Sequence, residues 1–427
     1  MNTDSYPVQA SGQVAEHNQP GCGNLDDFFQ RALELHRQGK AESAIFLYQQ
    51  VLALDDTHWQ AAYNLGTANL ALGDPHEAIK AYHLAARQNP QDADIHFNLG
   101  LACKRAGRLE EAAQSYLCAM EIAPDDAEVH YNLALIYKEL GSTDAAITSL
   151  EIAVALRPEY GAAHGNLGVC YLDQDRVAEA IVCYRRLVEL DHNGVAARHI
   201  LAALTGETTD VAPSSYISEL FDSFAAHFEE RLLVDLEYRT PWELKSLLLA
   251  DSDGPSCFAR LLDLGCGTGL VGEIFQEISA CRIGVDLSPK MVAAAAAKKV
   301  YDELVVAEIV SFLEQNQEPF DLIVAADVLI YAGELDRIFA ALARGLAENG
   351  RIIFSTEQMT GQGYQLRQSG RYAHAYSYIE AVAARHGLRI LSAQTANLRK
   401  EKGQWIAGDL YLLTISGNRP CWPPASS

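Results

Sequence analysis

Two carboxylates and three glycines are spaced in a pattern that could bind a nucleotide. The stretch Leu261–Gly269 (LLDLGCGTG) predicts a buried strand that breaks into a glycine-rich turn, with Asp263 near the end of the apolar run. The glycines stand at every second position: Gly265, Gly267 and Gly269. Glycine lets the backbone approach a ligand closely and adopt positive φ angles. A second apolar run, Cys281–Asp286, also ends in an acid, and an acid at that strand tip binds ribose hydroxyls in doubly wound folds.

The glycine spacing separates two kinds of nucleotide site. A dinucleotide fingerprint, G-x-G-x-x-G/A, would place its third small residue at Leu270, which is too large for close helix–strand packing, so an NAD-dependent oxidoreductase is disfavoured. The spacing present, followed by Gly284–Pro289 (GVDLSP), resembles that of the class I S-adenosylmethionine-dependent methyltransferases. The resemblance implies that the glycine loop lies against the methionine part of S-adenosylmethionine and that Asp286 binds its ribose hydroxyls.

The C-terminal half alternates predicted strands and helices, which indicates a parallel sheet with helices on both faces. Strands are expected at Ala259–Leu264, Cys281–Asp286, Leu304–Ala307, Phe320–Ala325, Arg351–Ser355, Arg389–Ala393 and Leu410–Ile415. The resemblance implies that the last strand is reversed and lies between the fifth and the sixth. We therefore expect an α/β Rossmann-like domain with a seven-stranded, mostly parallel sheet.

Four further candidate residues follow from their places after these strands. By resemblance, Glu308 would face the adenine amino group, although its carboxylate could instead cap the helix that follows. Asp327 would lie beside the methionine part and the transferable methyl group. Tyr331 and His374 are the candidate bases for an acceptor that must lose a proton, and a helix cap is the alternative role of His374.

An apolar helix precedes this domain. Ile217, Phe221, Phe224 and Phe228 share one helical stripe. The surrounding segment, 220–228, resembles the helix that precedes the core in biotin-synthesis and ubiquinone-type methyltransferases, where it forms part of a lid over the cofactor cleft. A core helix packed on the sheet is the alternative.

The N-terminal half repeats every 34 residues, the period of tetratricopeptide (TPR) arrays. Five repeats are predicted, and they begin at Leu25, Trp59, Ala93, Ala127 and Gly161. Small residues at fixed places let paired helices approach each other, and aromatic residues fill the space between them. The segment Val195–Leu204 is expected to be a solvating cap helix. The fold expected here is an all-α TPR solenoid.

One recurrence in the repeats is not required for packing. An asparagine occupies the sixth place of four successive repeats, at Asn64, Asn98, Asn132 and Asn166. A primary amide can pair with both groups of a peptide unit. The pattern resembles the asparagine ladder of the TPR superhelix in the eukaryotic O-linked N-acetylglucosamine transferase, which holds extended peptide, and it predicts a protein or peptide partner. The alternative is that these amides bond to neighbouring helices.

Composition limits the remaining possibilities. A formal charge of −23 over 427 residues argues against nucleic acid as a partner, because a phosphate backbone needs a basic surface. The nine cysteines are scattered without metal-ligand spacing, so we expect no metal site. No apolar run approaches the roughly 20 residues of a membrane span, and the first residues lack the features of a signal peptide. We expect a cytoplasmic protein that does not bind membranes.

These patterns together predict five segments. They are a tail at 1–24, a TPR solenoid with its cap at 25–205, a linker at 206–216, a methyltransferase domain at 217–418 and a tail at 419–427. The function expected is methyl transfer from S-adenosylmethionine, with the repeats recruiting a protein or peptide as acceptor or scaffold. Two alternatives remain open: a TPR adaptor with a non-catalytic cofactor-binding fold, and a small-molecule O-methyltransferase whose repeats form a homo-oligomer.

Overall fold

The computed structural model describes residues 25–191, 194–225 and 227–416, and the chain divides into two compact units after Asp191. The tails expected at 1–24 and 419–427 lie outside the described residues.

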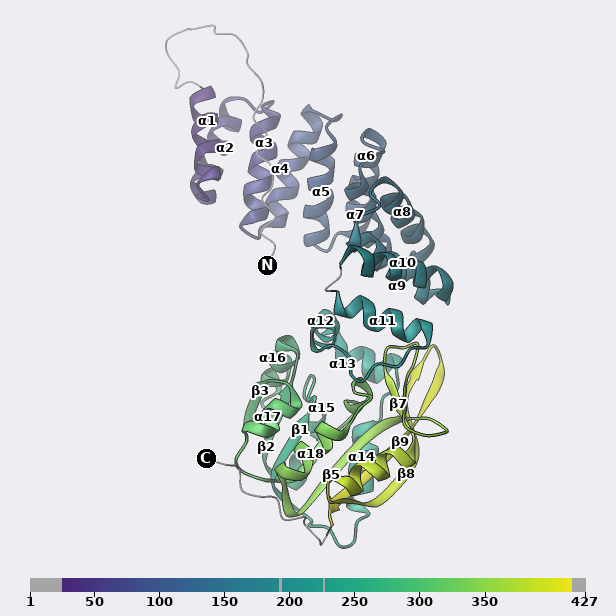
Figure 1. The fold of residues 1–427 in the computed structure, drawn as a ribbon. Helices are drawn as coiled ribbons and strands as arrows, with labels where there is room; N and C mark the ends of the chain where they lie inside the picture. The colour runs from purple at the N-terminus through teal and green to yellow at the C-terminus, as the bar shows by residue number, and fades with distance from the viewer. Residues whose placement is uncertain (1–24, 192–193, 226, 417–427) are drawn as a thin grey trace, which may run out of the picture. The chain divides into compact units, whose positions relative to one another are not determined.

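The first unit is a helical solenoid (Figure 1). Its helices are α1 (Leu25–Arg37), α2 (Ala41–Leu54), α3 (Trp59–Ala71), α4 (Pro75–Gln88), α5 (Ala93–Arg105), α6 (Leu109–Ile122), α7 (Ala127–Glu139), α8 (Thr143–Leu156), α9 (Gly161–Asp173) and α10 (Val177–Leu190). The first helix of each pair begins at the residue predicted from the 34-residue period. The tight turn inside each repeat requires a left-handed residue. Four repeats use a glycine at φ between +73° and +80°, and the fifth uses Asp175 at +58°.

Each repeat is held together by close contact between its two helices. A Cβ added to Gly66 would lie 2.7 Å from the ring of Tyr82, and one added to Gly100 would lie 2.9 Å from the ring of Tyr116. Both tyrosines are fully buried. The Leu-Gly signature therefore recurs because only glycine leaves room for the aromatic side chain of the second helix.

The second unit is built on one sheet. Its strands are β1 (Phe258–Leu264), β2 (Ser279–Asp286), β3 (Glu303–Val306), β4 (Phe320–Ala325), β5 (Leu346–Gln358), β6 (Tyr364–Leu366), β7 (Tyr372–His374), β8 (Leu388–Glu401) and β9 (Gln404–Ile415). Strands β3, β2, β1, β4 and β5 are neighbours in that order and run parallel. Strand β9 pairs antiparallel with both β5 and β8, which confirms the reversed strand expected between the fifth and sixth.

The predicted number of strands was wrong, because the described residues form nine strands rather than seven. The additional strands, β6 and β7, form a short antiparallel hairpin, and β7 pairs with the end of β5. Each has only three residues, which is too short for a two-residue alternation of apolar and polar side chains to be recognised.

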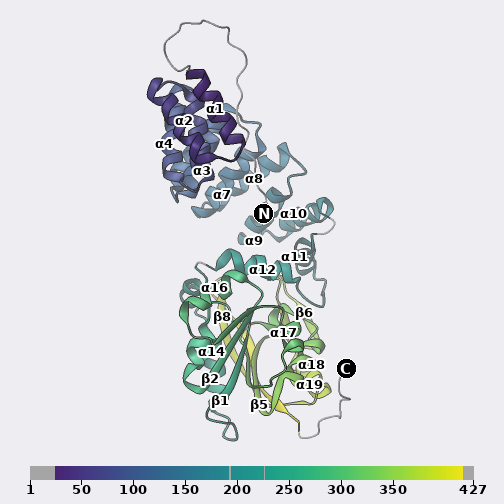
Figure 2. The same cartoon turned by 90° about the vertical axis from the view of Figure 1, so that its left-hand side faces the viewer.

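Helices cover both faces of this sheet (Figure 2). The second unit contains α11 (Val195–Thr205), α12 (Ser214–Phe224), α13 (Phe228–Glu230), α14 (Thr240–Leu249), α15 (Leu270–Phe275), α16 (Pro289–Lys298), α17 (Ile309–Gln315), α18 (Asp336–Gly345) and α19 (Tyr376–Arg385). Alternate strand residues serve the two faces: Leu262 and Ile323 pack with α17, α18 and α19, whereas Leu261 and Leu322 pack with α14 and α15. None of the helices in the described part of the chain combines the length and the apolar composition needed to cross a membrane.

The predicted solenoid cap, α11, belongs to the second unit instead. The carbonyl oxygen of Gly370 lies 3.0 Å from Nε2 of the buried His199, and Ala203 packs with Tyr372. The boundary expected at 205–206 therefore falls inside the second unit, because the chain divides after Asp191.

The predicted linker is also tied down within the second unit. The N–H of Ala212 donates to the carbonyl of Tyr331 at 3.0 Å, and Val211 forms a β-bridge with Ala332. The Asp210 carbonyl accepts from the N–H of Gly333 at 2.8 Å. The segment has no hydrophobic period and contains Gly and Pro, which suggested a flexible linker. An extended segment that forms hydrogen bonds with neighbouring loops has the same sequence features.

Candidate cofactor and acceptor site

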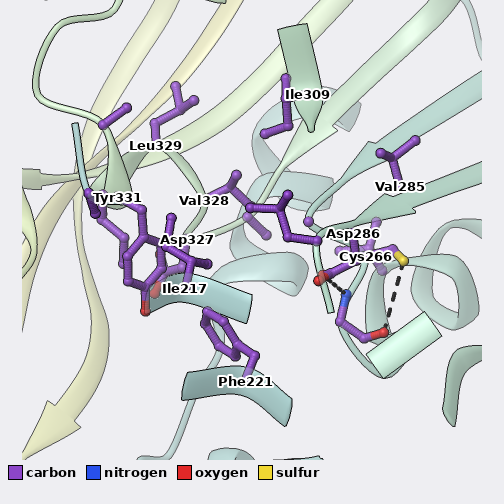
Figure 3. A pocket seen from close by; sticks show the side chains of 18 of the residues that line it. Ile217, Phe221, Cys266, Val285, Asp286, Ile309, Asp327, Val328, Leu329 and Tyr331 are labelled. Carbon is purple, nitrogen blue, oxygen red and sulfur yellow. Dashed lines mark hydrogen bonds between the residues drawn. The ribbon is translucent and has the colours of Figure 1, made fainter. Parts of the chain in front are cut away.

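A cavity lies at the carboxyl ends of the central strands (Figure 3). The glycine loop after β1 and Asp286 at the end of β2 form one side, and Asp327 and Tyr331 after β4 form another. Apolar side chains of α12 and the turns after it complete the lining. This edge of an open parallel sheet is where such folds bind ligands.

Asp286 and the glycine loop hold each other in place. Its carboxylate accepts hydrogen bonds from the N–H groups of Gly267 and Ser288, both at 2.9 Å. Burial raises the pKa of Asp286, and these N–H donors oppose that rise by stabilising the ionised form. Gly265 has φ of +66°, and a Cβ there would lie 2.3 Å from the Val328 side chain. Gly265, Gly267 and Asp286 line the cavity together.

Gly269 and Asp263 do not line the cavity. A Cβ on Gly269, which has φ of +95°, would lie 3.3 Å from Tyr301 and 3.4 Å from Ala295, so this glycine allows α15 to begin and to pack. Asp263 is 0% exposed and accepts a hydrogen bond from the Tyr301 hydroxyl at 2.5 Å. Its other oxygen, Oδ1, has no hydrogen-bond partner among the described residues. This placement favours a structural role for both residues.

Burial raises the pKa of Asp263 to about 8, and a stability test follows from the sign of this shift. The unfolded carboxyl titrates near its ordinary value, so the folded state binds the extra proton between about pH 4 and pH 8 and stability falls as pH rises through that window. We expect Asp263→Asn to remove this slope, which is about 1.4 kcal/mol per pH unit for one proton. Urea unfolding across that window measures it, with the exposed Asp302 changed to Asn as control. Equal slopes in Asp263→Asn and the unaltered chain would contradict the assignment.

Glu308 combines the two roles that the sequence left open. Its carboxylate caps α17 by accepting from the N–H groups of Val310 at 3.1 Å and Ser311 at 2.8 Å, and the residue also lines the cavity. Helix capping is therefore observed, and contact with an adenine amino group stays a prediction.

Asp327 adopts a left-handed backbone conformation, with φ of +55°. It accepts from the Ser355 hydroxyl at 2.7 Å and from Nη1 of Arg399 at 2.7 Å. A left-handed non-glycine residue is costly and persists where its surroundings fix it. These two bonds hold the carboxylate of Asp327, a residue that lines the cavity.

Two guanidinium groups at the cavity, one buried and one partly buried, were missed by the sequence analysis. Arg399 of β8 is 3% exposed and bonds to Asp327, Glu357 and Glu401. Arg371, at the end of the β6–β7 turn, bonds to Glu401, and its Nε lies 3.4 Å from the Tyr331 hydroxyl. Both arginines line the cavity. Burial raises the pKa of Glu401, but the two guanidinium groups outweigh burial and the net shift is downward.

The two candidate bases have different surroundings. Tyr331 lines the cavity, where Figure 3 shows it near Ile217. His374 does not line the cavity and is 0% exposed. Its Nε2 lies 2.9 Å from the Ala332 carbonyl, and burial lowers the pKa of His374 to about 4. A neutral ring bonded to backbone joins β7 to the loop after β4, so this placement does not support His374 as a base and favours a structural role.

Comparisons with known proteins agree with this geometry. A model of the methyltransferase domain matches residues 262–354, and tetratricopeptide-repeat models match residues 35–96, 67–127 and 131–194. The second unit contains a methyltransferase domain, and the first is a TPR array. The glycine spacing was therefore interpreted correctly.

Among curated proteins, the methyltransferase domain is similar to ubiquinone biosynthesis O-methyltransferases. That of Thiobacillus denitrificans is 29% identical over 142 residues, which cover 31% of this chain and 60% of the relative. That of Brucella anthropi is 29% identical over 161 residues, which cover 33% of this chain and 65% of the relative. The chain thus spans less than two thirds of the length of either protein.

The TPR array is similar to solved helical-repeat structures. A crystal structure of MamA is 22% identical with a TM-score of 0.37, and covers 38% of this chain and 94% of its own. YrrB, described as a TPR protein with an unusual peptide-binding site, is 20% identical with a TM-score of 0.38, and covers 40% of this chain and 89% of its own.

The segment before the methyltransferase domain is fastened by two carboxylates. Asp222 of α12 accepts from the Ser288 hydroxyl at 2.5 Å, and this bond lowers the pKa of Asp222. Glu229 of α13 accepts from the hydroxyl of Thr268 in the glycine loop at 2.9 Å and from Lys298 at 2.6 Å. Because Ile217, Phe221 and Phe228 of this segment line the cavity, the segment has the placement expected of a lid.

The asparagines of the TPR array have their amide N–H groups engaged. Each donates to the carbonyl four residues earlier in its own helix. Asn98 also donates to the Tyr63 hydroxyl at 3.1 Å, and Asn166 to the Tyr131 hydroxyl at 3.3 Å, which joins successive repeats. Both N–H groups of Asn98 and Asn166 are thus used, and peptide recognition by these residues stays a prediction.

Proposed function

We propose that this chain is an S-adenosylmethionine-dependent methyltransferase. The observation that carries the proposal is the bond between Asp286 and the Gly267 N–H, at the edge of a cavity in a methyltransferase domain. A left-handed glycine turn that exposes its backbone and an acid at the next strand tip fit the cofactor's methionine and ribose parts.

The residues that line the cavity would have different roles according to their positions. S-adenosylmethionine would supply a methyl group on a good leaving group, so alignment in a dry cleft provides most of the acceleration. Asp286 would accept hydrogen bonds from the ribose hydroxyls, and Glu308 would accept one from the adenine amino group. Gly265 and Gly267 would face the methionine part, next to Asp327. Phe221 and Phe228 would exclude water.

The decisive experiment is calorimetric titration of the full chain with S-adenosylhomocysteine, with NAD as the control. Micromolar binding of S-adenosylhomocysteine and none of NAD is the expected result. No binding of S-adenosylhomocysteine would contradict the proposal. Binding without transfer of labelled methyl to any fraction of a cell lysate would favour a non-catalytic adaptor.

The lid attachments predict a kinetic effect. We expect the pair Asp222→Asn and Glu229→Gln to release S-adenosylhomocysteine about 10-fold faster, because the closed segment loses charge-assisted hydrogen bonds at both loops. Stopped-flow displacement measures the rate, with the exposed Glu230→Gln as matched control. An unchanged rate would indicate that the segment stays in place without these carboxylates.

We further propose that the TPR array recruits a protein or peptide, as acceptor or scaffold. We expect Asn98→Ala with Asn132→Ala to lower methyl incorporation into the protein fraction of a lysate several-fold while leaving S-adenosylhomocysteine affinity unchanged. The variant's thermal unfolding serves as control, because Asn98 also bonds to Tyr63. Undiminished protein labelling would assign these asparagines a structural role.

A second candidate is a small-molecule O-methyltransferase that uses its repeats for self-association. The apolar lining from α12 and the turns after it, together with relatives named as ubiquinone biosynthesis O-methyltransferases, favours it. In that case labelled methyl would appear in the small-molecule fraction of the lysate rather than in protein.

A further inference from the structure

The charged groups that line the cavity form two clusters along the sheet, and Asp327 belongs to the cluster that contains the arginines, where it is paired with Arg399. Asp286 and Glu308 follow β2 and β3, whereas Arg371 and Arg399 lie at the side formed by β7 and β8. Strands β1 and β4 separate these two sides in the sheet order. The cluster of Asp286 and Glu308 is the one assigned above to ribose and adenine, so the cluster that contains the arginines is left for the methyl acceptor.

The two arginines differ in how far neighbouring acids neutralise them. Arg399 bonds to three carboxylates, those of Asp327, Glu357 and Glu401. Arg371 bonds to one carboxylate, that of Glu401, which it shares with Arg399. No hydrogen bond to a described residue uses Nη2 of Arg371. Arg371 therefore retains a charged N–H donor, Nη2, for a ligand in the cavity that it lines.

The position of Arg371 is fixed. Its carbonyl accepts from the Arg367 N–H at 2.8 Å across the β6–β7 turn, in which Gly370 has φ of +77°. Glu401 is held in turn by Nε of Arg399 at 3.0 Å. Such support holds a side chain in one geometry before ligand binds. Besides the Glu401 carboxylate, the guanidinium contacts the Tyr331 hydroxyl, which lies 3.4 Å from Nε.

We propose that the acceptor is a small apolar molecule that presents an anionic oxygen, as a carboxylate or a phenolate, and that Arg371 is the specificity residue that holds this oxygen. The inference rests on the proposed methyltransferase function. Of the two acceptor classes given above it selects the small molecule, with any partner of the TPR array acting as scaffold, and it goes further by naming the chemistry of that molecule. Val211, Ile217 and Phe221 supply an apolar wall for the body of the molecule.

The charge of Arg371 discriminates between acceptors. A guanidinium forms charge-assisted hydrogen bonds with an anionic oxygen and lowers the pKa of a phenol beside it. An alkylammonium acceptor would meet a like charge, which disfavours amines. In the reaction the oxygen forms a bond to the methyl carbon, the C–S bond breaks, and its electron pair goes to sulfur. A carboxylate arrives ionised, and a phenol releases its proton to water on binding, so no further reactant is needed.

The test uses the full chain saturated with S-adenosylhomocysteine and four probes: benzoate, 4-nitrophenol, benzylamine and benzamide. We expect benzoate to bind at least about 10-fold more tightly than benzylamine or benzamide, and the absorbance of bound 4-nitrophenol to report a pKa about one unit lower than in water. Arg371→Gln should abolish both effects. The control is Arg367→Gln, an exposed arginine of the same turn that does not line the cavity.

Each outcome has a definite meaning. A preference for benzylamine or benzamide, an unshifted nitrophenol, or no binding of benzoate and nitrophenolate at millimolar concentration would overturn the inference. So would an anion preference that persists in Arg371→Gln. The probe comparison on the unaltered chain still tests the inference if that variant fails to fold. Failure of S-adenosylhomocysteine itself to bind would overturn the proposed function instead.

Discussion

Asp286→Ala is expected to weaken S-adenosylhomocysteine binding by about 100-fold or more. Hydrogen bonds to an ionised group contribute about 1.5–3 kcal/mol each, and a carboxylate that accepts from two ribose hydroxyls would lose both. The substitution also frees the N–H groups of Gly267 and Ser288, so the glycine loop loses its attachment to β2. Calorimetric titration measures the loss.

A matched control separates this effect from a general loss of stability. Asp302 accepts from the Arg282 N–H at 2.8 Å, is exposed, and does not line the cavity, so Asp302→Ala removes a similar bond without touching the ligand. Its affinity for S-adenosylhomocysteine should stay within about two-fold of the unaltered chain. If Asp286→Ala binds as tightly as this control, the ribose assignment is wrong.

Local patterns determined most of the fold. The 34-residue period placed each repeat's first residue, because the tight contact of a glycine with a tyrosine of the second helix, such as Gly100 with Tyr116, recurs in three of the five repeats. The central strands followed from apolar runs that are buried on both faces, and Phe320–Ala325 was predicted to the residue. The errors lie where tertiary contacts decide. The three-residue strand Tyr372–His374 has no pattern of its own, and α11 is apolar on a face that the second unit covers.

The residues of the candidate site also fall into two groups: those that a local sequence pattern reveals and those that only tertiary contacts bring together. Gly265, Gly267 and Asp286 were found because the geometry of one strand–turn–helix unit requires those residue types at that spacing. Arg399 was missed because it opens the run Arg399–Lys402 (RKEK), which has the composition of a solvated turn. Its partner Asp327 is 72 positions away, so only the pairing of β8 with β9, and of β9 with β5, brings the two together.

Replacement of this buried arginine is expected to be the most destabilising substitution in the second unit. Arg399→Met leaves Asp327, Glu357 and Glu401 facing one another without their shared cation. Breaking a buried ion pair by removing one partner costs about 3–5 kcal/mol. Urea unfolding at neutral pH measures the loss. Arg389→Met, an exposed arginine of the same strand, is the control and should change stability by less than about 0.5 kcal/mol.

The pH dependence of Arg399→Met distinguishes lost charge balance from lost packing. In the unaltered chain the net pKa of Glu401 is lowered, so its contribution is present above the unfolded pKa and is lost as pH falls through the folded value. In the variant Glu357 loses its ion pair and Glu401 keeps only that with Arg371, so the folded pKa values of these two carboxyls rise and their protonation stabilises the folded state as pH falls. Burial already raises the pKa of Glu357, so it should protonate early. We therefore expect the difference in unfolding free energy between the unaltered chain and Arg399→Met to become smaller toward about pH 4–5. Adding Glu357→Gln to the variant should restore part of the lost stability at neutral pH. A gap that is constant with pH would show that Arg399 contributes by packing rather than by charge.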